Sequence, residues 1–188
     1  NIRFGPVVTP CLRRNPCLLA KMASSIDQIS NGRLELGIGT GDDPIYFEPW
    51  GQTYLPIKER IACLREEIEI IKKLWTEDSV DYQGTFYTLK EATNDPKPTQ
   101  RPHPPVWVGL VMGRKVMPKV AAELADAVNV YNASDVAAEE LLQLVQEHCE
   151  NIGRAFDEIP TSRNVNVIFT DGKKTFDRHI SGADGSLQ

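Results

Sequence analysis

The sequence predicts an α/β fold built on a parallel β-sheet. Two observations support this: segments with a β-strand pattern alternate with helical patterns along the 188 residues, and 41% of the residues are hydrophobic. Strands that alternate with helices are typical of βαβ units, whose strands run parallel. A third observation concerns ligands, because the apolar strand 33–38 ends in Gly39-Thr40-Gly41, followed by Asp42. Ligands bind at the carboxyl ends of such strands, and the alternative is a glycine-rich turn without a ligand.

The first half of the chain contains two predicted strands and two predicted helices. Residues 2–9 predict a strand, and Asn15-Pro16 then supplies an N-cap and a proline at the first helical position. After the strand 33–38 and a polar and aromatic loop, Pro56 opens the second helix. Both helices are expected to cover a face of the sheet with apolar residues at helical spacing, which are 18, 19, 22, 23, 26 and 29 in the first and 57, 61, 64, 68, 71 and 75 in the second.

The second half continues the alternation. Residues 80–89 predict a hairpin that turns at Gln83-Gly84, and the proline-rich segment 95–105 is expected to be extended. The remaining predicted elements are a strand at 106–109, a helix around 115–124, a strand at 127–131, a helix at 135–152 and a strand at 164–169.

Two α/β architectures compete for this pattern, the doubly wound sheet and the (β/α)8 barrel. The doubly wound dinucleotide-binding fold needs G-x-G-x-x-G leading straight into a helix. Here the glycines at 37, 39 and 41 lead into Asp42 and a long loop before Pro56. A barrel accommodates such insertions because its βα loops build the active site. The sequence therefore favours the barrel.

Composition excludes several classes of function. The net charge of −5 and pI of about 5.3 argue against a nucleic-acid partner. The apolar runs are too short for a membrane span. The four cysteines, at positions 11, 17, 63 and 149, lack the spacing of a zinc site or a disulfide scaffold. We therefore expect buried reduced thiols, no metal site and a cytoplasmic location. The chain starts inside a predicted strand without Met, which suggests part of a longer protein.

Two blocks of motifs, in matching order and spacing, resemble the bacterial luciferase-like monooxygenase superfamily. The resemblance covers about residues 1–170 and is nearest to members described as probable coenzyme F420-dependent oxidoreductases. The first block comprises Thr9-Pro10, Arg14-Asn15-Pro16, Leu19-Ala20-Lys21-Met22, Asp27, 29–33 and 37–41. The second comprises 82–87, 96–105 and 125–129.

The resemblance implies a (β/α)8 barrel that is incomplete in this chain. Residues 1–170 would form the partial barrel domain, starting at the third barrel strand, and 171–188 a tail or the start of the last unit. The family uses FMN or coenzyme F420 for hydride transfer with a small organic substrate, and its members are commonly dimers. The rival readings are an FMN-dependent monooxygenase using O2 and a non-catalytic, degenerate flavin-binding barrel.

The resemblance also implies a set of site residues. Pro6, Val7 and Thr9 lie where relatives carry a strand bulge behind the flavin ring, often with a non-prolyl cis peptide, expected here before Val7. The alternative is an ordinary strand in which Pro6 marks a bulge. Gly39, Thr40 and Gly41 would face the ring, with a hydroxyl on Thr40.

Asp42 takes the place of an acidic glutamate in deazaflavin-dependent relatives, although its side chain is one methylene shorter. Its alternative role is to cap a turn.

The loop from Gly109 through Gly113 and Arg114 lies where relatives bind the cofactor phosphate, and amides at a helix start favour an anion. Relatives usually carry glycine at 110 and a small residue near 112, so Leu110 and Met112 depart from the pattern. Met117-Pro118 is expected to interrupt the helix. The alternative is an apolar loop that packs on a partner subunit.

The remaining candidate residues are polar and aromatic. Asn129, with Asn132, could contact the flavin or close a turn. His103, His148 and His179 are expected to be structural or solvated. The aromatic residues of the 42–55 loop could line a substrate pocket or form a minor core, and they are Tyr46, Phe47, Trp50 and Tyr54.

Overall fold

The protein structure, a computed structural model, describes residues 2–41, 43–111, 113–131 and 133–164. Its strands are β1 (Thr9–Pro10), β2 (Leu36–Gly39), β3 (Val80–Gln83), β4 (Thr88–Ala92), β5 (Val106–Leu110), β6 (Ala127–Val130) and β7 (Thr161–Arg163). Its helices are α1 (Pro16–Ser30), α2 (Ile57–Thr76), α3 (Met117–Leu124) and α4 (Asp135–Ile152), with 3₁₀ turns η1 (Pro44–Tyr46), η2 (Glu48–Trp50) and η3 (Phe156–Glu158). The predicted hairpin is the separate sheet of β3 and β4.

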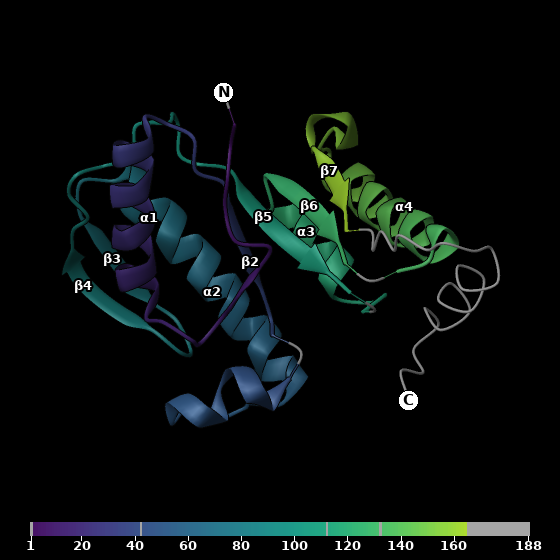
Figure 1. The fold of residues 1–188 in the computed structure, drawn as a ribbon, viewed down its shortest axis with the longest axis horizontal. Helices are drawn as coiled ribbons and strands as arrows, with labels where there is room; N and C mark the ends of the chain where they lie inside the picture. Colours follow the sequence, from purple (N-terminus) through teal and green to yellow (C-terminus); the bar gives the residue numbers. More distant parts are fainter. Residues whose placement is uncertain (1, 42, 112, 132, 165–188) are drawn as a thin grey trace, which may run out of the picture.

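The main sheet is parallel and its strands are adjacent in the order β1-β2-β5-β6-β7. Figure 1 shows α2 between α1 and β2, α3 behind β5 and β6, and α4 beside β7. The strand order follows the sequence without reversal, whereas a doubly wound sheet reverses at its switch point. The described strands therefore advance in one direction, as they do around a (β/α) barrel.

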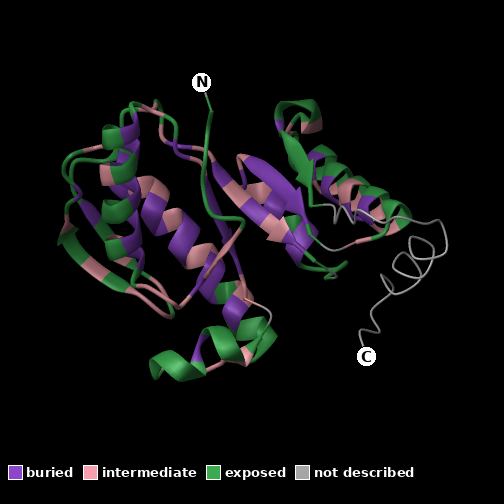
Figure 2. Ribbon diagram, in the orientation of Figure 1, coloured by how far each residue is buried: buried purple, intermediate pink, exposed green. Residues whose placement is uncertain are grey.

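The register of the sheet separates a core row from a row at the carboxyl ends. Ile38, Val108 and Val128 are paired across three strands and are fully buried. Gly109 and Asn129 are paired one residue later along β5 and β6, and their side-chain positions face the opposite side because side chains alternate along a strand. Figure 2 shows that burial concentrates in β5, β6 and the inward face of α2.

Helix α1 begins and ends where the sequence predicts, but only part of its predicted apolar face is buried. The Asn15 side chain accepts a hydrogen bond from the amide of Cys17, and Asn31 ends the helix in the left-handed conformation. Its buried face is built mainly from small residues such as Ala20 and Ala23, which let the helix approach its neighbours closely. Leu19 and Ala23 of the predicted apolar face are buried, whereas four others are exposed, contrary to the prediction, and they are Leu18, Met22, Ile26 and Ile29.

Helix α2 carries the predicted apolar stripe over most of its length. Leu64, Ile68 and Ile71 are buried, and Trp75 is buried with its indole N–H donating to the Ala20 carbonyl at 3.0 Å. Two polar residues, Arg60 and Glu67, are buried on this face as well. The stripe therefore packs α2 against α1 and the sheet. It also contains two charged side chains, those of Arg60 and Glu67.

Other element boundaries differ from the predictions. Of the predicted strand 2–9, only Thr9 belongs to a strand, apart from a bridge between Phe4 and Leu34. β7 pairs with β6 at Thr161–Arg163, a segment that was not predicted to be a strand. Residues 165–169 of the predicted strand 164–169 lie outside the described residues. Pro118 does not interrupt a helix, because it lies in the first turn of α3, where a missing amide is tolerated.

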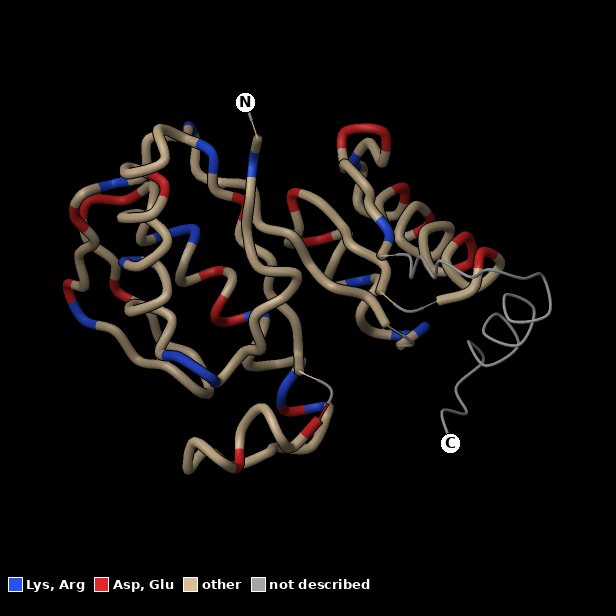
Figure 3. The backbone as a smooth tube through the Cα atoms, viewed as in Figure 1, with Lys and Arg blue, Asp and Glu red and all other residues tan. Residues whose placement is uncertain are grey.

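Among the described residues, no group of His, Cys, Asp and Glu side chains could hold a metal ion. Cys11, Cys63 and Cys149 are buried free thiols, as predicted, and Cys17 is half-buried. Figure 3 shows acidic and basic positions interspersed along the described backbone. In that part of the chain, no helix combines the length and the apolar character needed to cross a bilayer.

Candidate functional site

A cavity of about 260 Å³ lies at the carboxyl ends of β1, β2, β5 and β6. The register of the sheet explains why Gly109 and Asn129 line the same cavity, since they are paired across β5 and β6. Six of the predicted site residues line it, namely Val7, Gly39, Thr40, Gly41, Gly109 and Asn129. The glycine-rich turn and Asn129, which are 90 residues apart in the sequence, therefore belong to one site.

The segment before β1 carries a non-prolyl cis peptide, but one bond later than expected. The cis bond joins Val7 to Val8, not Pro6 to Val7. Val8 packs against the glycines of the neighbouring strands: a Cβ at Gly39 would lie 2.7 Å from Val8 Cγ2, and one at Gly109 would lie 3.1 Å from Val8 Cγ1. Both glycines are needed for this close approach, because a Cβ at either position would crowd Val8.

Asn129 presents an unmatched acceptor to the site. Its side chain is 4% exposed, and its Nδ2 donates to Ser162 Oγ at 2.9 Å. Its Oδ1 is buried without a hydrogen-bond partner among the described residues. Buried acceptors are normally paired, because an unpaired one costs about 1–3 kcal/mol. An N–H donor of a bound molecule would satisfy this oxygen.

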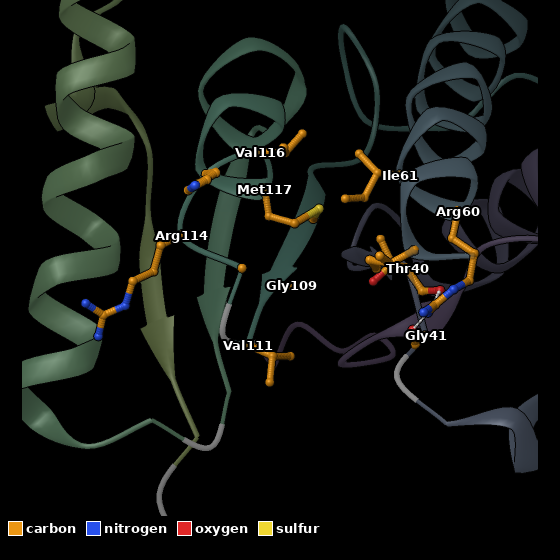
Figure 4. Close-up of a pocket in the computed structure, with 12 residues that line it drawn as sticks. Thr40, Gly41, Arg60, Ile61, Gly109, Val111, Arg114, Val116 and Met117 are labelled. Atoms are coloured by element: carbon orange, nitrogen blue, oxygen red, sulfur yellow. Dashed lines mark hydrogen bonds between the residues drawn. The ribbon is translucent and has the colours of Figure 1, made fainter. Parts of the chain in front are cut away.

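A second cavity of about 460 Å³ adjoins the first and contains the predicted phosphate loop. Thr40, Gly41 and Gly109 line both cavities. Gly113 and Arg114 line only the second, but the Arg114 side chain extends toward α4 (Figure 4), where it pairs with Glu140 at 2.6 Å. The charge of Arg114 is therefore partly neutralised by α4. Pro118 in the first turn of α3 also removes one amide that an anion could use.

Arg60 is a buried residue of the site that the sequence did not reveal. Its Nη1 donates to the Thr40 carbonyl at 3.1 Å and to the Gly41 carbonyl, and its Nε donates to the Leu55 carbonyl at 2.9 Å. Figure 4 shows the side chain reaching from α2 to this turn. Its Cζ lies 4.2 Å from the centroid of the Tyr54 ring. Arg60 thus fixes the turn that precedes Asp42.

A buried carboxyl group, that of Glu67, lies about two helical turns further along α2. Glu67 Oε1 accepts hydrogen bonds from the amide of Leu12 at 2.7 Å, from the Tyr87 hydroxyl at 2.8 Å and from the Cys63 thiol at 3.5 Å. Burial raises the pKa of Glu67 to about 7. A hydrogen bond with Cys63 and burial raise the pKa of the Cys11 thiol. This cluster ties the segment after β1 to α2 and the hairpin.

A signal for both residues exists in the sequence. Arg60 and Glu67 recur at helical spacing with Cys63, Leu64 and Ile71 on the buried face of α2. A charged residue on an apolar stripe is rarely left unpaired, so its presence there indicates a buried network.

Two described residues of the predicted site, Pro6 and Thr9, line neither cavity. Pro6 is exposed, and its carbonyl lies against β2 near Gly37. Thr9 shares the row of Ile38, and its hydroxyl accepts from Arg14 at 3.3 Å. Asp42, like Met112 and Asn132, lies outside the described residues.

The aromatic loop divides into two parts. Tyr46 lines the 260 Å³ cavity, and Trp50 is stacked with Arg13, whose Cζ lies 5.0 Å from the ring centroid. Phe47 is fully buried and packs on Tyr54 with the ring centroids 5.4 Å apart. Phe47 thus belongs to a minor core.

The two described histidines line neither cavity. His103 packs on Trp75 and approaches Asp126 at 3.7 Å, and His148 lies on α4. His179 lies outside the described residues. Leu110, which departs from the family pattern, is 1% exposed in the core, so packing accounts for its size.

The comparisons with known proteins decide the family. The family model described as luciferase-like monooxygenase matches residues 1–181. The chain belongs to the luciferase-like monooxygenase family. Its one-directional parallel sheet, with the site at the carboxyl ends, agrees with the (β/α) barrel of its structural neighbours, of which the chain covers about half.

Individual relatives within the luciferase-like family are oxidoreductases by name. The chain is 30% identical over 165 residues to an F420-dependent glucose-6-phosphate dehydrogenase of Amycolatopsis mediterranei. The aligned region covers 87% of this chain and 48% of that relative. The chain therefore spans about half the length of the curated relatives it matches.

Two solved structures show the shared fold. Monooxygenase RslO1 from Streptomyces bottropensis is 23% identical with a TM-score of 0.79, covering 98% of this chain and 56% of that one. The coenzyme F420-dependent tetrahydromethanopterin reductase from Methanopyrus kandleri is 27% identical with a TM-score of 0.77, covering 88% and 50%.

Proposed function

We propose that this protein is a flavin- or deazaflavin-dependent oxidoreductase that transfers a hydride between its cofactor and a small organic substrate. The observation that carries the proposal is the buried Asn129 Oδ1, which has no hydrogen-bond partner among the described residues and lies in a cavity walled by the backbone of Gly39–Gly41 and Gly109. A flat ring with N–H donors at its edge fits such a site. The names of the F420-dependent relatives support coenzyme F420 as the cofactor, with FMN as the second choice.

The residues present would hold the cofactor at both cavities. The backbone at Gly39 through Gly41, the Thr40 hydroxyl and Asn129 would contact the ring, and Val7 would lie behind it. The loop at Gly113–Lys115 would receive the phosphate, with Lys115 as the cation that lines the cavity there. The cofactor supplies the hydride chemistry, whereas the protein supplies position and electrostatics.

We propose Asp42 as the residue that holds the proton exchanged with the substrate. Its chain neighbour Gly41 lines both cavities, and Arg60 fixes the Gly41 carbonyl. The change Asp42→Asn should lower kcat by at least 100-fold, the usual scale of acid–base catalysis, while the affinity for the cofactor stays within twofold. An unchanged kcat would assign Asp42 to the turn alone.

The test of the cofactor is a titration of the protein in its natural length with F420 and with FMN, followed by fluorescence. Saturable 1:1 binding of F420, with F420H2-dependent or F420-dependent turnover, is the expected result. Turnover that needs FMN and consumes O2 would instead support the monooxygenase, which the likeness to RslO1 favours. Binding of neither cofactor would overturn the proposal, and binding without turnover of any substrate would support the degenerate, flavin-binding protein.

Assembly and location belong to the same proposal. The stripe of Leu18, Met22, Ile26 and Ile29 on α1 is exposed and apolar, which supports a homo-oligomeric, dimeric protein. The buried free thiols support a reducing, cytoplasmic location. We also propose that 1–170 form one partial barrel domain, whereas 171–188 lie outside the described residues. Sedimentation of the wild type against Ile29→Glu tests the dimer, since the charge should dissociate it.

A further inference from the structure

We propose that Arg13 is an anion-binding residue for the substrate. Its guanidinium would receive a carboxylate or phosphate group of the molecule that occupies the 260 Å³ cavity, which Arg13 lines. This inference rests on the proposed function, because it requires a substrate beside the cofactor. It adds the chemical class of that substrate and a residue that selects it.

The first observation is that Arg13 has unused donors. Its guanidinium donates no hydrogen bond and forms no ion pair with any residue that the structure describes. Every other arginine in the described ranges donates to or pairs with a protein oxygen, and these are Arg3, Arg14, Arg33, Arg60, Arg65, Arg101, Arg114, Arg154 and Arg163. A guanidinium has five N–H donors in a planar fork that matches carboxylate and phosphate groups.

The second observation is that this fork is held in place. The guanidinium lies over the Trp50 ring, with Cζ 5.0 Å from the centroid. The Arg13 carbonyl accepts a hydrogen bond from Gln52 Nε2 at 2.8 Å, which joins the segment after β1 to the end of η2. Stacking on an aromatic face leaves the edge N–H groups for an acceptor in the guanidinium plane. Less rotamer entropy is then lost when an anion binds.

The third observation is the charge of the cavity. None of the described residues that line it is acidic, and Arg13 is its charged lining residue. The whole chain has a net charge of −5, so this unbalanced cation contrasts with its surroundings. Tyr46 and Tyr131 add neutral polar groups to the same walls.

The arrangement of the two cavities points to the substrate as the source of the anion. Lys115 lines the 460 Å³ cavity and Arg13 the 260 Å³ cavity, and the two share Thr40, Gly41 and Gly109 between them. A cofactor whose phosphate binds beside Lys115 is paired with a cation of the 460 Å³ cavity. Arg13, the cation of the 260 Å³ cavity, is then available to a second molecule.

The experiment uses a matched set of six-carbon probes. Glucose 6-phosphate, gluconate and glucose are titrated calorimetrically into the F420-saturated protein in its natural length, for the wild type, Arg13→Gln and Arg13→Lys. We expect at least one anionic probe to bind at least tenfold more tightly than glucose. Arg13→Gln should remove this preference, and Arg13→Lys should retain part of it. Arg3→Gln, which removes an equal charge from the Glu35 pair, is the control and should leave every affinity unchanged.

Three results would overturn the inference. One is a wild type that binds no anionic probe more tightly than glucose, and another is an undiminished preference in Arg13→Gln. The third is a loss of F420 affinity in Arg13→Gln with the probe preference intact, which would assign the anion to the cofactor.

The proposed function can fail separately. If the wild type binds neither F420 nor FMN, the same probes are titrated into the cofactor-free protein. Binding of an anionic probe that depends on Arg13 would then still support the anion site, and its absence would overturn both proposals.

Discussion

Two regions at the carboxyl end of the sheet use charged residues in opposite ways. Beneath the Thr40–Gly41 turn, Arg60 donates to three backbone carbonyls, and Glu67 Oε1 accepts from an amide, a hydroxyl and a thiol. In the cavity on the other side of the same turn, Arg13 donates to no described residue and Asn129 Oδ1 accepts from none. In the lower region, that of Arg60 and Glu67, the charged side chains form hydrogen bonds with the protein itself. In the cavity, the Arg13 donors and the Asn129 Oδ1 acceptor are available to a ligand.

This difference separates residues that build the site from residues that use it. A buried charge is stable only when its hydrogen bonds are made, so removing the Arg60 guanidinium from the lower region should strongly destabilise the protein. Unmatched groups in the cavity contribute little to folding, and changing them should alter binding instead. The following predictions test that separation, and they are ordered by the expected size of the change in stability.

The largest effect is expected for Arg60→Met. The change leaves the Thr40, Gly41 and Leu55 carbonyls without their donor, so the free energy of unfolding should fall by about 3 kcal/mol. Urea denaturation measures it. Arg65→Met is the control on the same helix, because Arg65 pairs with Glu123 nearer the surface and should contribute at most about 1 kcal/mol. Equal losses in the two variants would contradict the assignment of Arg60.

Glu67→Gln should change stability in a pH-dependent way. Burial raises the pKa of Glu67 from 4.5 to about 7, so the folded state holds its proton where the unfolded state has lost it. The stability of the wild type should therefore fall as the pH rises from 4.5 to 7 and level off above. Glutamine mimics the protonated acid, so the variant should be more stable by about 2–3 kcal/mol at pH 8 and equal at pH 4.

Chemical denaturation from pH 4 to pH 8 measures this difference. The exposed Glu59→Gln on the same helix is the control and should show no such trend. A Glu67→Gln variant that is destabilised equally at both ends of the range would show that the carboxyl group is charged in the folded protein.

Gly39→Ala should be more harmful than Gly109→Ala. The new Cβ would lie 2.7 Å from Val8 Cγ2 at position 39, but 3.1 Å from the nearest Val8 carbon at position 109. Overpacking of this kind costs about 1–3 kcal/mol, and the smaller overlap should cost about 1 kcal/mol. Adding Val8→Ala to Gly39→Ala should recover part of the loss. No recovery in thermal denaturation would show that Val8 is not the residue that requires glycine.

The sequence predicted the parts of the fold that depend on local pattern and caps. Helix α4 has the predicted bounds because Ser134 caps its start and Gly153, at φ 74°, ends it. The polar residues Thr161–Arg163 pair with β6, although the sequence pattern favoured the more apolar segment 164–169. Residues 165–169 lie outside the described residues, so that strand stays a prediction.

The site was also predicted only in part, because local sequence patterns reveal strand ends but not the hydrogen bonds between distant side chains. The glycine turn and Asn129 follow from strand ends, so their meeting could be anticipated from the order of parallel strands. The role of Arg13 could not, because a sequence does not show that a guanidinium lacks an acceptor. The exposed stripe of α1 was also assigned to the wrong side, since a helical period does not say which face is buried.

The most direct test of the account is the affinity of Asn129→Leu for coenzyme F420, measured by fluorescence titration beside the wild type. Leucine has a similar size but offers no acceptor, so the account predicts an affinity at least tenfold lower, with a free energy of unfolding within about 1 kcal/mol of the wild type. An unchanged affinity for F420 and FMN in a folded variant would contradict the claim that this cavity holds the cofactor.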